Sequence, residues 1–143
     1  MQLTKFSDYA LRILMAAATK DPDLISIPEI ARTFGISEAH IRKVTHELMR
    51  AGFLTAERGR MGGYRLGRDP GKITVASVIR FTEPNLDVVE CFDPSNNQCR
   101  LAPGCVLKSA LRQALHAFVR VLDGYTIADL VKNRRRVAEL LGI

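Results

Sequence analysis

The chain has 143 residues, of which 47% are hydrophobic and 25% are charged, and its formal net charge at pH 7 is +6. This length fits one compact domain, or a small domain with an appended element, and the apolar fraction is sufficient for a core. Because the sequence holds no apolar run near the roughly 20 residues of a membrane span and no signal-peptide pattern at its start, we expect a cytoplasmic protein without membrane contact.

The first two helices are predicted by apolar spacing and by capping residues. One apolar stripe recurs every three or four residues and predicts a helix over Thr4–Thr19; it consists of Phe6, Tyr9, Ala10, Ile13, Leu14 and Ala17. Ser26 is expected to cap the next helix, and Glu29 completes a capping box. That helix should end near Phe34, where Gly35 supplies the left-handed residue.

A third helix, from Ser37 to about Ala51, completes a helix-turn-helix pattern. This motif requires a small residue where the two helices touch, a glycine at the turn and two apolar anchors on the second helix. The residues at relative positions 0, +4, +10 and +13 meet these requirements: Ala31, Gly35, Ile41 and Val44. An ordinary helical hairpin inside a core is the alternative.

The outward face of the third helix offers hydrogen-bond donors that suit base edges and phosphates in a DNA major groove. The residues expected to contact DNA from this helix and its cap are Ser37, Glu38, His40, Arg42 and Lys43.

Two short segments, Phe53–Ala56 and Tyr64–Leu66, are predicted to pair as strands around a glycine-rich tip. A hairpin that directly follows a helix-turn-helix is a wing. Between Arg58 and Lys72 five basic residues are opposed only by Asp69, which favours a nucleic acid partner over a merely solvated cationic surface. The wing residues expected to contact DNA, in part through its narrow minor groove, are Arg58, Arg60, Gly62, Gly63 and Tyr64.

A fourth helix is predicted from Val75 to about Thr82, with Thr74 as its cap. A long helix is predicted from about Cys105 to Gly124. Its apolar residues alternate at spacings of four and three: Leu107, Leu111, Ala114, Phe118, Val121 and Tyr125. We expect the winged-helix core to be complete by residue 82, so this seam favours a dimer over packing within one chain.

The predicted fold class is therefore mostly α with a small β-hairpin wing. Residues 1–82 form a winged helix-turn-helix DNA-binding domain, residues 83–104 form a cysteine-bearing loop, and residues 105–143 form the dimerisation helix and the C-terminal helices. Within this last part a short helix begins at Thr126–Asp129, and the run Arg134–Arg136 is interpreted as a solvated turn.

Three cysteines, Cys91, Cys99 and Cys105, lie within fifteen residues. An odd number of clustered cysteines in a cytoplasmic chain argues against a disulfide framework and favours metal or redox chemistry. The spacing leaves three interpretations open: a zinc site that lacks one ligand, a thiol sensor, or an iron–sulfur cluster with a fourth, non-cysteine ligand.

Enzymatic chemistry is the least favoured class of function. The sequence shows no glycine-rich nucleotide loop, no paired carboxylate site and no Ser-His-Asp order. His40 and His46 lie on the expected DNA-binding face, and His116 lies on the long helix. A thiol or iron–sulfur enzyme is therefore kept only as an alternative.

Four segments together resemble a known family: LTKFSDYALRIL, RGRMGGYRLG, the three-cysteine loop and YTIADLV. The family comprises the winged-helix iron–sulfur transcription regulators of the NsrR, RirA and IscR types, and the resemblance covers nearly the whole chain. It implies a homodimer that binds palindromic double-stranded DNA. It also implies an iron–sulfur cluster held by Cys91, Cys99 and Cys105.

The resemblance also distinguishes subgroups. IscR-like members carry a histidine three residues after the last cysteine, where this chain has Lys108. In NsrR-like members an aspartate of the first helix reaches over from the partner subunit and completes a [4Fe-4S] site; Asp8 matches it. The resemblance therefore favours [4Fe-4S] over [2Fe-2S] and a repressor released by nitric oxide, since a carboxylate is a weak ligand for iron that nitric oxide could displace.

Two observations keep alternatives open. Without the resemblance, Asp8 is interpreted as a first-turn acid that complements the helix dipole. The seven-residue gap after Cys91 and the segments VVECF and LLGI look more like RirA, so an iron-responsive repressor is the alternative function.

Overall fold

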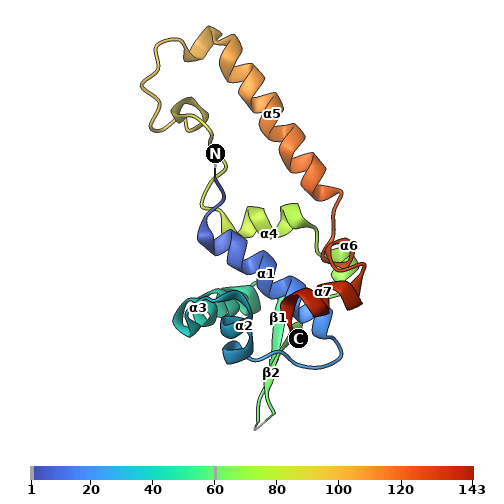
Figure 1. Ribbon diagram of the computed structural model, residues 1–143. Helices are drawn as coiled ribbons and strands as arrows, with labels where there is room; N and C mark the ends of the chain where they lie inside the picture. The colour runs from blue at the N-terminus through green and yellow to red at the C-terminus, as the bar shows by residue number, and fades with distance from the viewer. Residues whose placement is uncertain (1, 60) are drawn as a thin grey trace.

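The computed structural model describes residues 2–59 and 61–143 and shows a largely helical chain with one antiparallel strand pair (Figure 1). The elements are α1 (Lys5–Lys20), α2 (Ile27–Phe34), α3 (Glu38–Arg50), β1 (Leu54–Glu57), β2 (Gly63–Leu66), α4 (Val75–Thr82), α5 (Val106–Asp123), α6 (Ile127–Leu130) and α7 (Arg134–Leu141), with 3₁₀ turns η1 (Pro70–Lys72), η2 (Glu90–Phe92) and η3 (Ala102–Gly104). The predicted fold class is confirmed. Arg60, a predicted DNA contact, lies outside the described residues.

The helices begin where the capping residues predict. The hydroxyls of Thr4, Ser26, Ser37 and Thr74 each accept a hydrogen bond from the backbone N–H three residues on. These bonds satisfy amides that have no partner within the helix, which fixes each helix start locally. Gly35 ends α2 in the left-handed conformation, with a φ of 63°.

α1 is the central element of the core and contacts α3, α4, α6, α7 and β2. Its buried face carries several alanines, which allow neighbouring helices to approach closely, together with the fully buried Ile13 and Leu14. The two helix-turn-helix anchors, Ile41 and Val44, are buried in the same cluster. The apolar pattern thus places α3 on α1 with its other face outward.

The core is not complete at residue 82, contrary to the expectation from sequence. After α5 the chain returns to the body: Ile127 is fully buried, and its N–H donates to the carbonyl of Ile73 at 2.9 Å. The run Arg134–Arg136 is not a solvated turn either, because it forms the first turn of α7. The reason is that Val137 and Leu141, farther along that helix, pack against the core.

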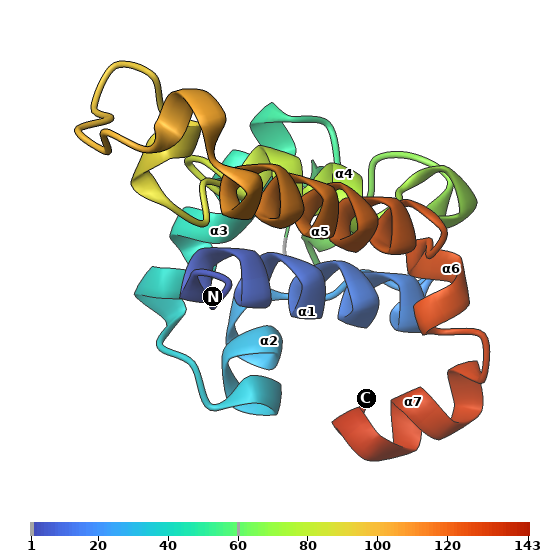
Figure 2. The same cartoon turned by 90° about the horizontal axis from the view of Figure 1, so that it is seen from above.

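α5 projects away from the body formed by α1, α2 and α3, toward the end of the molecule opposite the wing (Figure 1), and seen from above it runs across α4 and α1 (Figure 2). The structure describes all 18 of its residues, and none of them is buried. The predicted seam divides between two faces: Leu111 and Phe118 are half-buried, whereas a second stripe is exposed and consists of Leu107, Ala110, Ala114, Ala117, Val121 and Tyr125. We call this exposed set the α5 stripe. Among the described helices, none has the length and apolar character needed to cross a bilayer.

The C-terminal end of α5 is clamped to α4. The Arg80 guanidinium donates to both carboxylate oxygens of Asp123, at 3.0 and 2.5 Å, and the Thr74 hydroxyl donates to the same carboxylate at 3.3 Å. The hydrogen bond from Arg80 lowers the pKa of Asp123. The other end of α5 is connected to the body through residues 83–104.

Candidate nucleic-acid interface and cysteine loop

The first turn of α3 is organised around Ser37. Its hydroxyl accepts the N–H of His40 at 3.4 Å and lies 2.8 Å from Nδ1 of the same residue. The imidazole also faces the ring of Tyr9, with 6.5 Å between ring centroids. Ser37 therefore serves as a cap that also orients His40 at the exposed start of the helix.

The cationic side chains of α3 are exposed, and the ion pair that Arg42 forms is weak. Arg42 approaches Glu38 at 3.7 Å, and both side chains are more than half exposed. An exposed pair of this kind contributes only about 0.3–0.5 kcal/mol, so Arg42 is readily released to another anion. Arg42 and Lys43 border an open hollow on the outer face of α3 together with Ala39 and His46.

The wing is shaped by glycines that leave no space for a side chain. A Cβ at Gly62 would lie 2.5 Å from the carbonyl oxygen of Glu57, and a Cβ at Gly63 would lie 2.9 Å from that of Ile25. Tyr64 exchanges two backbone hydrogen bonds with Ile25, at 2.9 and 3.0 Å, and this bridge joins a third chain segment to the β1–β2 pair. These three predicted residues have a structural part in the wing; their contact with DNA stays a prediction.

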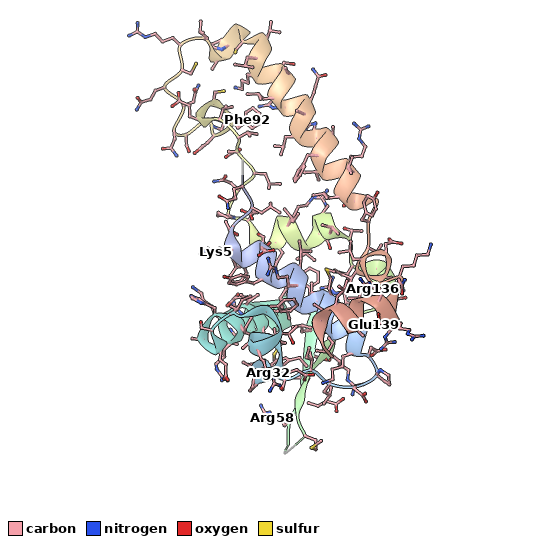
Figure 3. All side chains as sticks on the ribbon, in the orientation of Figure 1. Lys5, Arg32, Arg58, Phe92, Arg136 and Glu139 are labelled. Atoms are coloured by element: carbon pink, nitrogen blue, oxygen red, sulfur yellow. The ribbon has the colours of Figure 1, made fainter. Side chains whose placement is uncertain are left out.

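α3 and the wing lie at the same end of the molecule and flank an open groove of about 410 Å³. Arg42 lines the groove from α3, and Arg58 lines it from the wing (Figure 3 labels Arg58). Arg65, which pairs with Glu57 at 2.5 Å, lines instead a second hollow together with Met61 and residues 20–24. The structure thus brings the described members of the predicted DNA-contacting set to one end, and it separates them from the cysteines.

The cysteine loop lies at the opposite end, next to Phe92 (Figure 3). The three cysteines, all within the described residues, are free thiols: Cys91 is buried in η2, whereas Cys99 and Cys105 are partly exposed. Cys105 caps α5, because its Sγ accepts the N–H of Lys108 at 3.3 Å. The Phe92 ring is covered by the guanidinium of Arg112 at 5.4 Å.

The donor set suits an iron–sulfur cluster, because three free thiols are the ligands that such clusters take. One thiol already accepts a backbone N–H, the type of bond that stabilises a thiolate. Within residues 2–59 and 61–143, however, no group of three or more Cys, His, Asp or Glu is arranged to hold a metal ion. The loop would have to draw the three sulfurs together.

Asp8 is engaged within its own helix. Its carboxylate accepts from Nε of Arg12 at 3.0 Å and pairs with Nη2 at 2.9 Å, and both side chains are about half exposed. It is also the acidic residue in the first turn of α1. In a single chain the carboxylate thus complements the helix dipole, and a role as ligand across a dimer stays a prediction.

Sequence reasoning missed Glu83, which follows α4 and begins the cysteine loop. Its carboxylate accepts from the N–H of Thr4 at 2.8 Å, from the Thr4 hydroxyl at 3.1 Å and from the buried Ser7 hydroxyl. Partial burial raises the pKa of Glu83, but the hydrogen bonds from Ser7 and Thr4 outweigh burial and lower it. No local pattern could have paired residues 79 positions apart.

A family model described as Rrf2, an iron-dependent transcriptional regulator, matches residues 3–133. The HTH-type transcriptional regulator NsrR of Geobacillus kaustophilus is 46% identical over 142 residues, covering 99% of this chain and 97% of that protein. Protein aau3 of Rhizobium meliloti is 46% identical over 143 residues, covering 100% and 93%.

Two solved structures show the same arrangement of elements. CymR, the global cysteine regulator of B. subtilis, aligns with a TM-score of 0.74 at 27% identity, covering 93% of this chain and 98% of that one. IscR of T. potens aligns with a TM-score of 0.74 at 26% identity, covering 93% and 88%.

Proposed function

Since this chain belongs to the Rrf2 family of transcriptional regulators, and not to a family of enzymes, we propose that it is a cytoplasmic, homodimeric repressor of nitric-oxide-responsive genes. In this proposal the dimer binds palindromic operator DNA, its affinity depends on an iron–sulfur cluster, and nitric oxide releases it.

The observation that carries the DNA-binding part is the joint presentation of α3 and the wing around one open groove. His40, Arg42 and Lys43 stand on the first turns of α3, where side chains reach base edges in a major groove. Arg58 stands on the wing and lines the same groove, and an arginine in this position suits the negative potential of a minor groove. Arg42 is held by a weak pair with Glu38, which opposes its release to DNA little.

The α5 stripe supports the homodimer. Its members follow the three-and-four spacing that two packed helices require. Val121 is 60% exposed and Leu107 is 65% exposed in the single chain. Apolar surface gains about 25 cal/mol for each Å² removed from water, so a second copy of the same helix is the partner that this stripe favours. Two α3 helices would then face two half-sites.

Cys91, Cys99 and Cys105 would hold the cluster, and the resemblance to NsrR adds Asp8 from the partner subunit as fourth ligand and favours [4Fe-4S]. Such a group supplies, when bound, an iron centre that reacts with nitric oxide. The chain's own contribution is mechanical: bringing the three sulfurs together would rearrange residues 83–104. Glu83 starts that segment and binds Thr4, the N-cap residue of α1, and α1 packs on α3. A rearrangement of the loop would therefore reach α3 through α1.

The runner-up is an iron-responsive repressor. The matching family model is described as iron-dependent, and a relative without the NsrR name is as similar as the NsrR proteins are. Both functions use the same three cysteines and differ in the signal.

One experiment separates these functions. The operator is selected from a random duplex library with anaerobically purified, reconstituted protein, and its binding is followed by fluorescence anisotropy. One arm adds nitric oxide and a second removes iron with a chelator. Release by nitric oxide at constant iron supports the proposal, whereas release by the chelator alone supports the iron-responsive repressor. Equal affinity of apo and loaded protein for the operator would rule out both.

A further inference from the structure

The start of α7 carries a cationic cluster that the predicted DNA-binding face does not include. Lys132, Arg135 and Arg136 are all exposed, and we call them the α7 cations. Arg135 and Arg136 share one acid, Glu139, at 3.2 and 3.5 Å, and their side chains are 92% and 63% exposed. This sharing leaves the cluster with a net positive charge.

Two of the α7 cations stand where the dipole of their own helix disfavours positive charge. The N-terminus of a helix carries a partial positive charge, so cations in the first turn are unfavourable and anions are favoured. The first turn of α7 is Arg134–Arg136, with Asn133 as its cap. A feature that violates a local stability rule is expected where function requires it. A polyanion would offset both the dipole and the mutual repulsion of the arginines.

The fold places the cluster on the wing side of the molecule. Nε of Arg134 donates to the carbonyl of Thr19 at 2.6 Å, which joins the start of α7 to the end of α1. The chain then continues into residues 20–24, and that connection lines a hollow together with Met61 and Arg65 of the hairpin. In Figures 1 and 3, α7 and Arg136 accordingly lie with the DNA-binding body and away from α5 and the cysteine loop.

We propose that the α7 cations bind backbone phosphates of duplex DNA that flanks the operator, on the far side of the wing from α3. This inference rests on the proposed DNA binding and extends it beyond α3 and the wing. Arginine suits the task because its planar guanidinium forms paired hydrogen bonds with phosphate oxygens. Phosphate contacts carry no sequence information, so the cluster adds affinity and length of footprint without changing operator preference.

The test compares two duplexes: the selected operator alone, and the same operator extended by about ten base pairs, one helical turn, on each side. The variants are R135Q/R136Q and E139Q, with R120Q as a control that removes an exposed charge from α5. Anisotropy titrations over 50–200 mM salt give the affinity and the salt slope. Circular dichroism verifies that each variant keeps its helices.

We expect the double variant to bind the extended duplex about tenfold more weakly at 0.1 M salt, with a salt slope lower by about 0.9 for each phosphate that it no longer neutralises. Its affinity for the operator alone should equal that of wild type. E139Q should act in the opposite direction and tighten binding to the extended duplex, since it frees both arginines. R120Q should leave both affinities unchanged.

The inference is wrong if R135Q/R136Q matches wild type on the extended duplex, or if it weakens binding to both duplexes equally. Either result leaves the proposed function intact, because wild type would still bind its operator through α3 and the wing. If wild type itself binds no operator, the proposed function fails instead. The two failures are thus distinguishable.

Discussion

The carboxylate of Glu83 accepts both the backbone N–H and the hydroxyl of Thr4, at 2.8 and 3.1 Å. The first residue of the cysteine-bearing segment therefore also holds the N-cap residue of the first helix of the DNA-binding body. Ser7, buried one turn further along α1, donates to the same carboxylate. These bonds make the start of the loop and the start of α1 one structural unit.

Glu83→Gln should lower the free energy of unfolding at pH 7 by about 1–2 kcal/mol, because hydrogen bonds to a charged acceptor are removed or weakened. The folded-state pKa of Glu83 is lowered, so its contribution is present above the ordinary carboxyl range and is lost as pH falls through the folded pKa. Urea unfolding should thus show that the difference in free energy of unfolding between wild type and Glu83→Gln is smaller at about pH 3 than at pH 7. The exposed Asp87→Asn is the control; a difference of the same size at both pH values would contradict the assignment.

Replacing any one of the three cysteines should abolish iron and sulfide binding and leave the helices intact. Cys91→Ala and Cys99→Ala serve for the first two positions. Cys105→Ser suits the third, because a serine hydroxyl keeps the cap that Cys105 provides to the N–H of Lys108. Iron and sulfide analysis with visible absorbance measures the first effect, and circular dichroism the second. Full cluster occupancy in Cys99→Ala would refute the three-thiolate site.

Asp8→Ala should loosen the cluster or alter its reaction with nitric oxide, and Arg12→Gln should change the same reaction by freeing the carboxylate. Neither change should cost more than about 1 kcal/mol of stability, since the pair is exposed and one helical turn apart. Stopped-flow absorbance during nitric oxide addition provides the measurement. Unchanged kinetics in both variants would return Asp8 to its role at the helix dipole.

Wing and recognition-helix variants should weaken DNA binding in different ways. Arg58→Gln should weaken binding to all sequences and lower the salt slope by about 0.9 for each phosphate that is no longer neutralised. At least one alanine variant among His40, Arg42 and Lys43 should instead relax the preference at one operator position, by about 1–3 kcal/mol. A dimer requires this relaxation in both half-sites. Selection from operator libraries with each position randomised makes the comparison, and a uniform weakening in all variants would contradict it.

Ala114→Glu should convert the proposed dimer to a monomer, because it places a charge at the centre of the α5 stripe. The fold should survive, since Ala114 is exposed in the single chain. Sedimentation velocity measures the change, and Gln113→Glu, exposed but outside the stripe, is the matched control. A dimeric Ala114→Glu would show that the copies meet elsewhere.

The parts of the fold that sequence predicted well are those fixed by neighbouring residues. Ser26 and Glu29 form the predicted capping box, Gly35 adopts the predicted left-handed turn, and α4 occupies the predicted residues. Caps and apolar periodicity act over three to seven residues, so the sequence displays them directly.

The parts that sequence did not predict depend on residues far apart. The pairing of Ile127 with Ile73, and the return of α7 onto α1, unite segments that no local spacing relates. The charge of Arg134 predicted a solvated turn. The sequence does not reveal that its guanidinium donates to the carbonyl of Thr19, which lies far away along the chain. For the same reason the convergence of Thr4 and Ser7 on Glu83 was missed.

The C-terminal end of α5 is joined to the body by the Arg80–Asp123 pair and by the backbone hydrogen bond from Val75 to Tyr125, so a tilt of α5 would turn about this end. At a rise of about 1.5 Å per residue, its 18 residues span about 27 Å from this end to the cysteine-bearing end. A tilt of about 5° therefore moves the far end by about 2 Å. In a dimer held together through its α5 helices, the same tilt swings each body in the opposite sense. Because half-sites recur every 34–36 Å or so along DNA, a swing of a few ångströms at the cysteine loop is converted into a change of spacing that a rigid duplex does not match.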